Sequence, residues 1–188
     1  FPALLSRGLI PDGARVLDLG CGQGCLEALL IAAGKQFDAG IWPEGWRAPP
    51  RNITLHGIEL QERTANWART ALGSKAIILT GDIHELTLPY ADVVVLLDVL
   101  HYMDRPTQGR VLARIARALR GDGLLLLRIN DAGAGLPSTG RLTSTGSMLS
   151  ATDEKRSFID LIIWIENCAP GQDFLSALDS SSSMWSPA

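Results

Sequence analysis

The octapeptide LDLGCGQG, residues 17–24, contains residue types that can hold a charged ligand. Glycine recurs at alternate positions, as Gly20, Gly22 and Gly24, directly after the hydrophobic run 16–19. Glycines in such a turn permit positive φ angles and let a ligand approach the backbone. A helix beginning after the turn offers free N–H groups to a phosphate or a carboxylate. The stretch is therefore a candidate binding turn, and its alternative is a turn with a purely structural role.

Two further hydrophobic runs end in acids that could recognise a nucleoside. Glu59 lies between Ile58 and Leu60, and its carboxylate could accept both hydroxyls of a ribose while the apolar neighbours cover a purine. Asp82 could accept a hydrogen bond from an exocyclic amine, with Ile83 packed on the ring. The structural alternatives are a solvated strand-end acid for Glu59 and an Asx turn or helix cap for Asp82.

A fourth hydrophobic run ends in Asp98, and His101 and Tyr102 follow shortly after it. An acid next to a buried strand is costly unless it is paired or functional. Histidine is the side chain that most often serves as a general base, so His101 could act as one. Alternatively, His101 orients a substrate or caps the helix expected to begin near Pro106.

The elements that position these residues follow from the hydrophobic pattern. Apolar and β-branched runs predict strands at 15–19, 53–59, 76–79, 91–97 and 124–129. Helical spacing predicts helices at about 23–34, 61–72 and 107–119. This alternation predicts an α/β fold with a mostly parallel, twisted sheet and helices on both faces. Ligands of such sheets bind beyond the carboxyl ends of the strands, where all the residues above are expected.

Composition restricts the classes of function. The 188 residues are 46% hydrophobic and 20% charged, which suits one globular domain spanning 1–188. A net charge of -3 gives no basic footprint for nucleic acid, and no apolar run is long enough for a membrane span. Three cysteines, an odd number, favour a reducing, cytoplasmic compartment. Cys21 and Cys25 do not have the usual spacing of zinc ligands, so we expect two buried thiols and no metal site.

The motifs VLDLGCGQG, GIEL, TGDI and LLDVLHY, in this order, resemble those of class I S-adenosylmethionine (AdoMet)-dependent methyltransferases. The resemblance covers about residues 10–131, and the combination is much more specific than any single motif. It implies a Rossmann-like three-layer sandwich with AdoMet as the cofactor.

The resemblance also implies a role for each motif residue. Asp18 would support the glycine turn, and Asp98 would close the site near the amino group or the transferred methyl. The remaining residues would contact the cofactor directly: Gly20, Gly22 and Gly24 the methionine part, Glu59 the ribose with Leu60 beside it, and Asp82 and Ile83 the adenine.

The implied reaction is transfer of the AdoMet methyl group to an oxygen, nitrogen or carbon nucleophile. A sulfonium is already a potent electrophile, so the protein mainly aligns the reactants and excludes water. His101 is the candidate base, and His101 with Tyr102 is the candidate acceptor site. The stretch 98–101 lacks the Asn/Asp-Pro-Pro-aromatic run of methyltransferases that act on base amino groups. A small metabolite or a lipid- or polyketide-like acceptor is therefore favoured.

Two alternatives belong to other classes of function. The first is a catalytically inactive AdoMet-binding partner subunit. The second is an NAD(P)-dependent oxidoreductase, but a dinucleotide fingerprint would have its third small residue one position after Gly24. The number of residues between the glycines and Glu59, which the segment 35–52 increases, also argues against an oxidoreductase. The sequence leaves the oligomeric state open.

Two segments depart from the pattern of the family. The stretch 35–52 is rich in proline, glycine and tryptophan, and it predicts a lid, a partner surface or a rigid surface loop with its tryptophans packed on the core. The C-terminal segment 132–188 shows no clear final strand pair. Its part 132–147 is typical of a loop, 158–165 is ambiguous between helix and strand, and 179–188 is typical of a tail.

Overall fold

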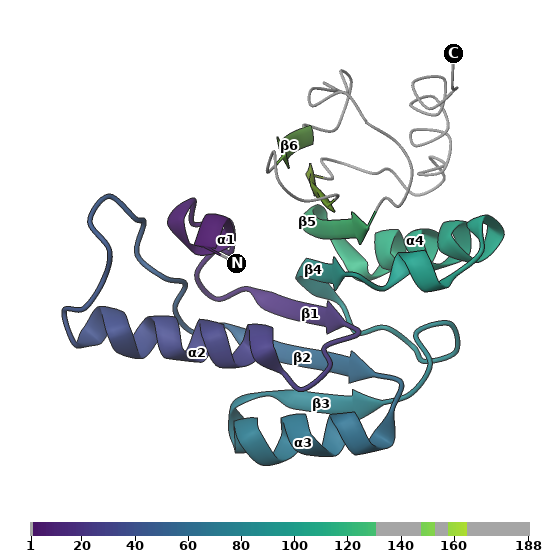
Figure 1. Ribbon diagram of the computed structural model, residues 1–188, viewed down its shortest axis with the longest axis horizontal. Helices are drawn as coiled ribbons and strands as arrows, with labels where there is room; N and C mark the ends of the chain where they lie inside the picture. Colours follow the sequence, from purple (N-terminus) through teal and green to yellow (C-terminus); the bar gives the residue numbers. More distant parts are fainter. Residues whose placement is uncertain (1, 131–147, 153–157, 165–188) are drawn as a thin grey trace. The chain divides into compact units, whose positions relative to one another are not determined.

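The computed structural model describes residues 2–130, 148–152 and 158–164 of the chain (Figure 1). The chain divides into two compact units, Phe1–Thr87 and Leu88–Ala188, called here the N-terminal and the C-terminal unit.

Three parallel strands form the sheet of the N-terminal unit. Its elements are α1 (Pro2–Ser6), β1 (Arg15–Leu19), α2 (Cys25–Asp38), β2 (Thr54–Glu59), α3 (Glu62–Leu72), the 3-10 turn η1 (Gly73–Lys75) and β3 (Ile77–Thr80). The central strand β2 pairs in parallel with β1 and with β3, in a register that places Leu17 opposite His56 and Ile58 opposite Leu79. The carboxyl ends of all three strands therefore lie at one edge of this sheet.

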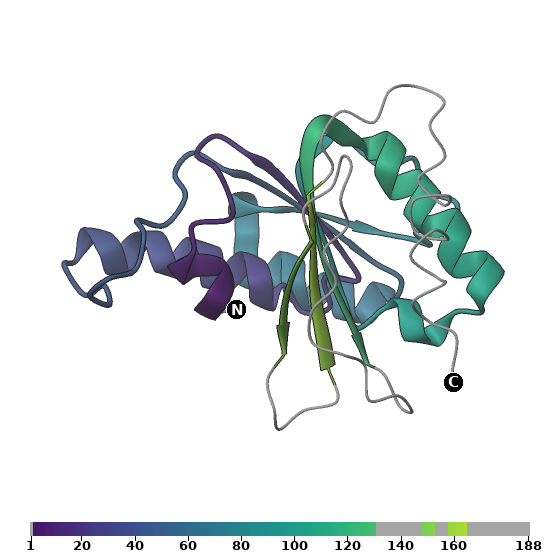
Figure 2. The ribbon, with the colours of Figure 1, turned by 90° about the horizontal axis from the view of Figure 1, so that it is seen from above.

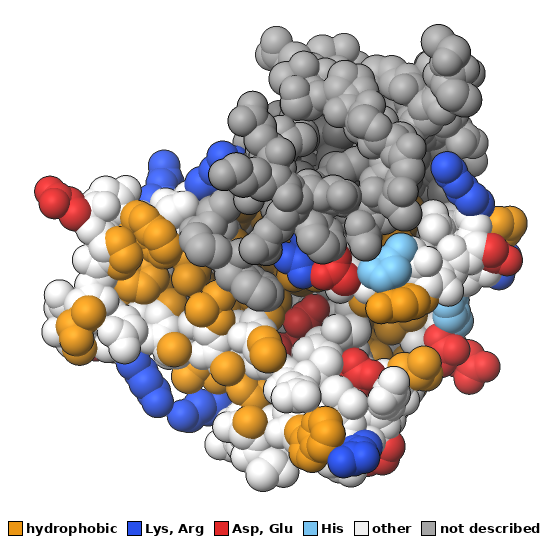
Figure 3. Space-filling model, in the orientation of Figure 1, with side chains coloured by type: hydrophobic (Ala, Val, Ile, Leu, Met, Phe, Trp, Pro, Cys, Tyr) orange, Lys and Arg blue, Asp and Glu red, His pale blue; other side chains and the backbone are white. Residues whose placement is uncertain are grey.

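Small side chains let α3 pack closely on this sheet. Ala65 and Ala68 of α3 are fully buried and cluster with Cys21, Leu72 and Ile78. Hydrophobic side chains also reach the surface, where Figure 3 shows them in orange beside polar groups. The large exposed ones in this unit are Phe37, Ile41, Leu60, Trp67, Ile77 and Leu79.

The C-terminal unit combines parallel and antiparallel pairing. Its elements are β4 (Ala91–Leu97), the 3-10 turn η2 (Leu100–Tyr102), α4 (Arg105–Ala118), β5 (Leu119–Asn130), β6 (Met148–Thr152) and β7 (Phe158–Trp164). Strand β4 pairs in parallel with β5, whereas β7 pairs antiparallel with both β5 and β6 (Figure 2). The valine-rich strand β4 is almost wholly buried between Val93 and Leu96, as its apolar run predicted.

The doubt about a C-terminal strand pair was wrong, because β6 and β7 form that pair. The ambiguous stretch 158–165 is largely the strand β7. Periodicity could not decide this, since a short continuous apolar run suits a buried strand and a buried helix equally. The predicted loop at 132–147 and the predicted tail at 179–188 lie outside the described residues.

The irregular segment after α2 is shorter than the predicted 35–52, because α2 continues to Asp38. Its aromatic side chains pack on one another edge to face. The ring centroids of Phe37 and Trp42 are 6.0 Å apart, and those of Trp42 and Trp46 are 5.7 Å apart. The indole N–H of Trp42 also donates to the carbonyl of Arg47 at 3.0 Å. The tryptophans thus pack within the segment and on the end of α2.

Arg51, near the C-terminal end of the same segment, contacts the end of α2 and the loop before β1. Its guanidinium forms an ion pair with Asp38 at 2.6 Å and lies over the ring of Phe37 at 5.4 Å. The backbone N–H of Arg51 donates to the carboxylate of Asp12 at 2.7 Å. The tryptophans do not pack on the core as the rigid-loop alternative expected, and the lid, the partner surface and the rigid loop stay predictions.

No helix within the described ranges has both the length and the apolar character needed to cross a bilayer.

Substituting Gly24 should test how tightly the turn before α2 is built. Gly24 has φ of 78°, and a Cβ there would lie 2.6 Å from Cδ1 of the buried Leu72. We expect Gly24→Ala to lower the free energy of unfolding by about 1–3 kcal/mol, from the left-handed backbone and from overpacking. Chemical denaturation measures this.

Gly34→Ala is the matched control. Gly34 lies inside α2, and outside the helix's own backbone nothing lies within 4 Å of the position that its Cβ would take. The same substitution should there stabilise the protein by about 0.5–1 kcal/mol. Equal effects at the two positions would contradict the strain argument.

Candidate functional site

The glycine turn between β1 and α2 is docked on β2 and open on one side. Gly20, Gly22 and Gly24 have φ angles of 78°, 57° and 78°. The N–H groups of Gly20 and Cys21 donate to the carbonyl of Ile58 at 2.8 and 3.1 Å. Nothing lies within 4 Å of the position that a Cβ of Gly22 would take. This open space is where a ligand can approach the backbone.

Strand β2 passes so close to the turn that only glycine fits at position 57. A Cβ on Gly57 would lie 2.7 Å from Sγ of Cys21 and 2.7 Å from Cδ1 of Ile78. The close approach brings the end of β2, and with it Glu59, next to the turn.

Glu59 connects the glycine turn to the start of α3. Its Oε2 accepts a hydrogen bond from the N–H of Gly22 at 3.0 Å, and its Oε1 accepts one from the N–H of Gln61 at 2.9 Å. A carboxylate has about four acceptor positions, so two remain for a ligand. Two backbone N–H groups therefore position the carboxylate of Glu59, and its role toward a ligand stays a prediction.

The segment after β3 is tied to the same edge of the sheet. The N–H of Gly81 donates to the carbonyl of Glu59 at 3.0 Å. Oδ1 of Asp82 accepts from the N–H of His84 at 2.8 Å, which is the predicted Asx turn. Ile83 is buried, at 8% exposure, whereas Leu60 is 66% exposed. Nε2 of His84 also lies 3.9 Å from the same oxygen of Asp82.

Two acids lie buried behind the glycine turn, and only one of them was predicted. Asp18 is 6% exposed and Glu27, in the first turn of α2, is 1% exposed. Burial, followed by repulsion from Glu27 and Glu59, raises the pKa of Asp18 well above its usual value. Burial also raises the pKa of Glu27 to about 7. The signal missed in the sequence was an acid next to Leu26 on the apolar face of the predicted helix.

The two cysteines of the turn differ in exposure, which corrects the expectation that both are buried. Cys21 is buried, but Cys25 is exposed, since it occupies the first position of α2 on the solvent side. Burial, followed by repulsion from Glu27, Asp18 and Glu59, raises the pKa of the Cys21 thiol. Cys21 is therefore held as the neutral thiol. No cluster of three potential metal ligands occurs in the part of the chain that the structure describes.

Asp98 lies in the C-terminal unit and is paired there with Arg128. Its backbone has φ of 58°, its N–H donates to the carbonyl of Arg128 at 3.0 Å, and its carboxylate accepts from Nε of Arg128 at 3.0 and 3.1 Å. Nη2 of Arg128 makes a further, short contact with the same carboxylate. The paired cation offsets the cost of placing an acid at the end of a buried strand.

His101 and Tyr102 are exposed side chains of η2 whose rings lie 4.1 Å apart between centroids. The proposed capping role of His101 was wrong. Asp104 caps α4 instead, because its Oδ1 accepts from the N–H of Thr107 at 2.8 Å. Helix α4 begins at Arg105, one residue before Pro106, and an Asp caps a helix better than an imidazole does.

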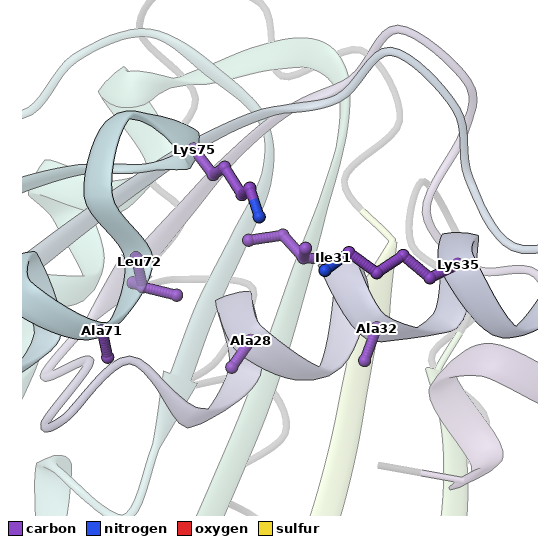
Figure 4. Close-up of a pocket in the computed structure, with 7 residues that line it drawn as sticks. All are labelled: Ala28, Ile31, Ala32, Lys35, Ala71, Leu72 and Lys75. Carbon is purple, nitrogen blue, oxygen red and sulfur yellow. The ribbon is translucent and has the colours of Figure 1, made fainter.

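A shallow hollow of about 160 Å³ lies elsewhere in the N-terminal unit (Figure 4). Lys35 and Lys75 extend toward Ile31 from either side of it. Its lining contains none of the predicted site residues: Ala28, Ile31, Ala32, Lys35, Ala71, Leu72 and Lys75. Its lining residue Leu72 also packs against Gly24, so the hollow adjoins the glycine turn without including a predicted site residue.

A family model described as a methyltransferase domain matches residues 2–161. The chain belongs to this methyltransferase family. The resemblance to class I AdoMet-dependent methyltransferases is thereby confirmed. An uncharacterized methyltransferase from Geobacillus sp. (strain WCH70) is 28% identical over 116 residues, which cover 60% of this chain and 46% of that relative. The chain thus spans less than half the length of the curated relative that it matches.

Solved structures show the same fold. A TehB-like methyltransferase from Corynebacterium glutamicum has a TM-score of 0.57 at 19% identity, over 88% of this chain and 87% of its own. The mitomycin 7-O-methyltransferase has a TM-score of 0.58 at 20% identity, over 81% and 49%. The cyclase SpnF has a TM-score of 0.53 at 19% identity, over 92% and 53%. The predicted Rossmann-like α/β fold is confirmed.

The raised pKa of Glu27 should make the protein less stable as pH rises. In the unfolded chain this acid ionises near its usual 4.5, but in the folded protein near 7. The contribution of Glu27 to the free energy of unfolding is therefore most favourable below about pH 4.5, where the acid is neutral in both states. As pH rises through 7 this free energy should fall by up to about 3 kcal/mol. Denaturant titrations at pH 5 and pH 8 measure the difference.

Glu27→Gln cannot ionise, so the fall in stability between pH 5 and pH 8 should be smaller in this variant. Glu44→Gln, at an exposed loop position, is the control and should keep the wild-type difference. A pH dependence that is the same in all three proteins would show that Glu27 ionises normally.

Proposed function

We propose that this domain binds AdoMet at the carboxyl edge of β1, β2 and β3 and transfers its methyl group to a small-molecule acceptor. The proposal rests above all on Glu59, whose carboxylate holds the N–H of Gly22 and still has acceptor positions free. When bound, AdoMet supplies a methyl group activated by a sulfonium. The proposal covers an oxygen, a nitrogen or a carbon atom as the methyl acceptor.

The residues of the N-terminal unit bind the cofactor in this proposal. Gly20, Gly22 and Gly24 line its methionine part, and α2 begins without a side-chain cap, so its first N–H groups are available to a carboxylate. Glu59 accepts the two ribose hydroxyls. Asp82 accepts from the adenine amine with its remaining oxygen, and the ring packs between Ile83 and Leu60.

The residues of the C-terminal unit have roles in the transfer that the resemblance implies. For Asp98 this role is near the amino group or the methyl, and within its own unit the pairing with Arg128 holds its carboxylate in one orientation. His101 is exposed and therefore accessible to an acceptor, from which it removes a proton. Tyr102 positions the same acceptor.

A small metabolite or a lipid- or polyketide-like intermediate is the proposed acceptor class. The net charge of -3 and the DVLHY motif support this class over a nucleic-acid substrate. We also propose that the chain works as a single AdoMet-binding domain in the cytoplasm. Membership of a methyltransferase family favours this activity over a nicotinamide-dependent one.

An inactive AdoMet-binding subunit remains the alternative, since one fold can host different functions. SpnF, for example, is similar in fold but is described as a [4+2]-cyclase and not as a methyltransferase. Incubation with AdoMet and a panel of small nucleophiles separates the two, because only an active enzyme forms S-adenosylhomocysteine.

Glu59→Ala should weaken AdoMet binding by about 2–4 kcal/mol, because charge-assisted hydrogen bonds to both ribose hydroxyls are lost. Isothermal titration calorimetry measures the dissociation constant. Glu44→Ala, at an exposed position between Pro43 and Gly45, is the matched control and should bind normally. An unchanged dissociation constant in Glu59→Ala would remove Glu59 from the site.

His101→Ala should leave AdoMet affinity intact and lower kcat by about 10²–10⁴, because the acceptor loses its general base. The acidic limb of the rate profile should disappear with it. If KM for the acceptor changes while the limb survives, His101 positions the acceptor instead. Normal turnover at every pH would exclude both roles.

A further inference from the structure

The strand β3 leaves one side of its backbone without a partner strand. Among the described strands, β3 pairs with β2 alone. Successive backbone groups of a strand point to opposite sides, and the N–H of Gly81 donates to Glu59 on the β2 side. Ile77 and Leu79 therefore direct their backbone groups to β2, whereas Ile78 and Thr80 direct theirs outward. This outer edge has the groups needed to add a further strand.

Apart from its shortness, β3 has none of the usual protections of an edge strand. Its residues Ile77–Thr80 contain no charged residue and no proline, and its pairing with β2 has no bulge. The side chains of Ile77 and Leu79 are 52% and 40% exposed, which adds apolar surface beside the edge. Such an edge is a template for pairing with another chain, so proteins commonly cover it. A cover for β3 must come from another element.

Arg69, in the last turn of α3, supplies this cover. Its Nε donates to the outward carbonyl of Ile78 at 2.9 Å, and its Nη2 donates to Oγ1 of Thr80 at 2.6 Å. Its Nη1 donates to Glu62 at 3.0 Å and to Asn66 at 2.7 Å. All three guanidinium nitrogens are thus engaged, which fixes the group over the edge. It occupies the position from which the N–H of an added strand would reach the carbonyl of Ile78.

The packing of α3 on the sheet depends on other residues. Ala65, Ala68 and Leu72 are buried against the sheet, whereas the side chain of Arg69 is 36% exposed. If Arg69 only held the helix, its removal would lower the stability of the protein and leave its mass in solution unchanged. If Arg69 covers the edge, its removal also makes the strand available to another chain.

We propose that Arg69 keeps two copies of this chain from joining their sheets through β3. In a solution of the pure protein, the strand available to an uncovered edge is β3 of a second copy. A closed dimer uses the same surface on both copies, so two-fold symmetry would pair the two strands antiparallel. Neither AdoMet nor the methyl transfer takes part in this contact.

Sedimentation equilibrium of the intact chain tests the proposal. In Arg69→Ala, the weight-average mass should rise with protein concentration toward about twice that of the wild type, as a two-fold dimer requires. The association constant should exceed that of the wild type by about 10-fold or more. The reason is that wild-type pairing must first break the charge-assisted bond to Ile78 in both copies.

Two further variants locate the contact. Arg63→Ala is the matched control, because Arg63 lies on the same helix but has its guanidinium over the ring of Trp67, at 4.8 Å. This variant should keep the wild-type mass. Adding Leu79→Lys to Arg69→Ala places a charge on the uncovered edge, where the lysines of two paired copies would repel each other. The double variant should return to the wild-type mass.

A mass of Arg69→Ala that equals that of the wild type at every concentration, with a native circular dichroism spectrum, would overturn the inference. Association that is equal in Arg63→Ala, or that persists in the double variant, would also overturn it, because the contact would then not use this edge. Arg69→Met keeps most of the aliphatic chain without the donors and repeats the test if Arg69→Ala does not fold. Failure of both variants to fold would show that Arg69 holds the fold itself, which contradicts a covering role.

Discussion

The hydrogen bond from the N–H of Gly22 to the carboxylate of Glu59, 3.0 Å long, joins the two parts of the chain on which the candidate site depends. One end is a turn of three left-handed glycines, which could take many conformations in isolation. The other end is fixed by the last residue of the central strand β2. The bond orders the turn and orients the carboxylate at once. The same contact explains why a ligand could use both the exposed backbone of the turn and the remaining oxygens of the acid.

The acids near this contact illustrate how a binding site can oppose stability. Glu59 has two backbone donors, so its charge is well supported. Neither side-chain oxygen of Glu27 has a hydrogen-bond partner of good geometry among the described residues, and burial raises its pKa by more than its own backbone N–H lowers it. Sites that must accept a charged ligand commonly violate the rules that a stable core obeys. The two glutamates thus differ in how well the fold supports a negative charge on them.

The sequence predicted most of the fold because each element has a local pattern. The strands 15–19 and 91–97 were predicted to the residue, since their apolar runs end at charged or glycine residues. The strand pair β6 and β7 was missed, because β7 joins the sheet by pairing with β5, and the paired residues lie far apart in the chain. The roles of Glu59 and Asp82 as acceptors stay predictions, although the order of motifs placed both at strand ends. Glu27 was missed because helical periodicity shows which face is buried, but not that an acid lies on it.

The close approach of β2 to the glycine turn also restricts which substitutions this sequence can accept during evolution. A Cβ at Gly57 would lie 2.7 Å from the sulfur of Cys21, so neither position can gain volume alone. A larger residue at 57 would need more room on two sides, because Cδ1 of Ile78 also lies 2.7 Å and Cβ of Cys21 lies 3.0 Å from the same position. Among homologous chains, position 57 should therefore stay glycine unless positions 21 and 78 both change. The second cysteine, Cys25, is exposed and carries no such restriction.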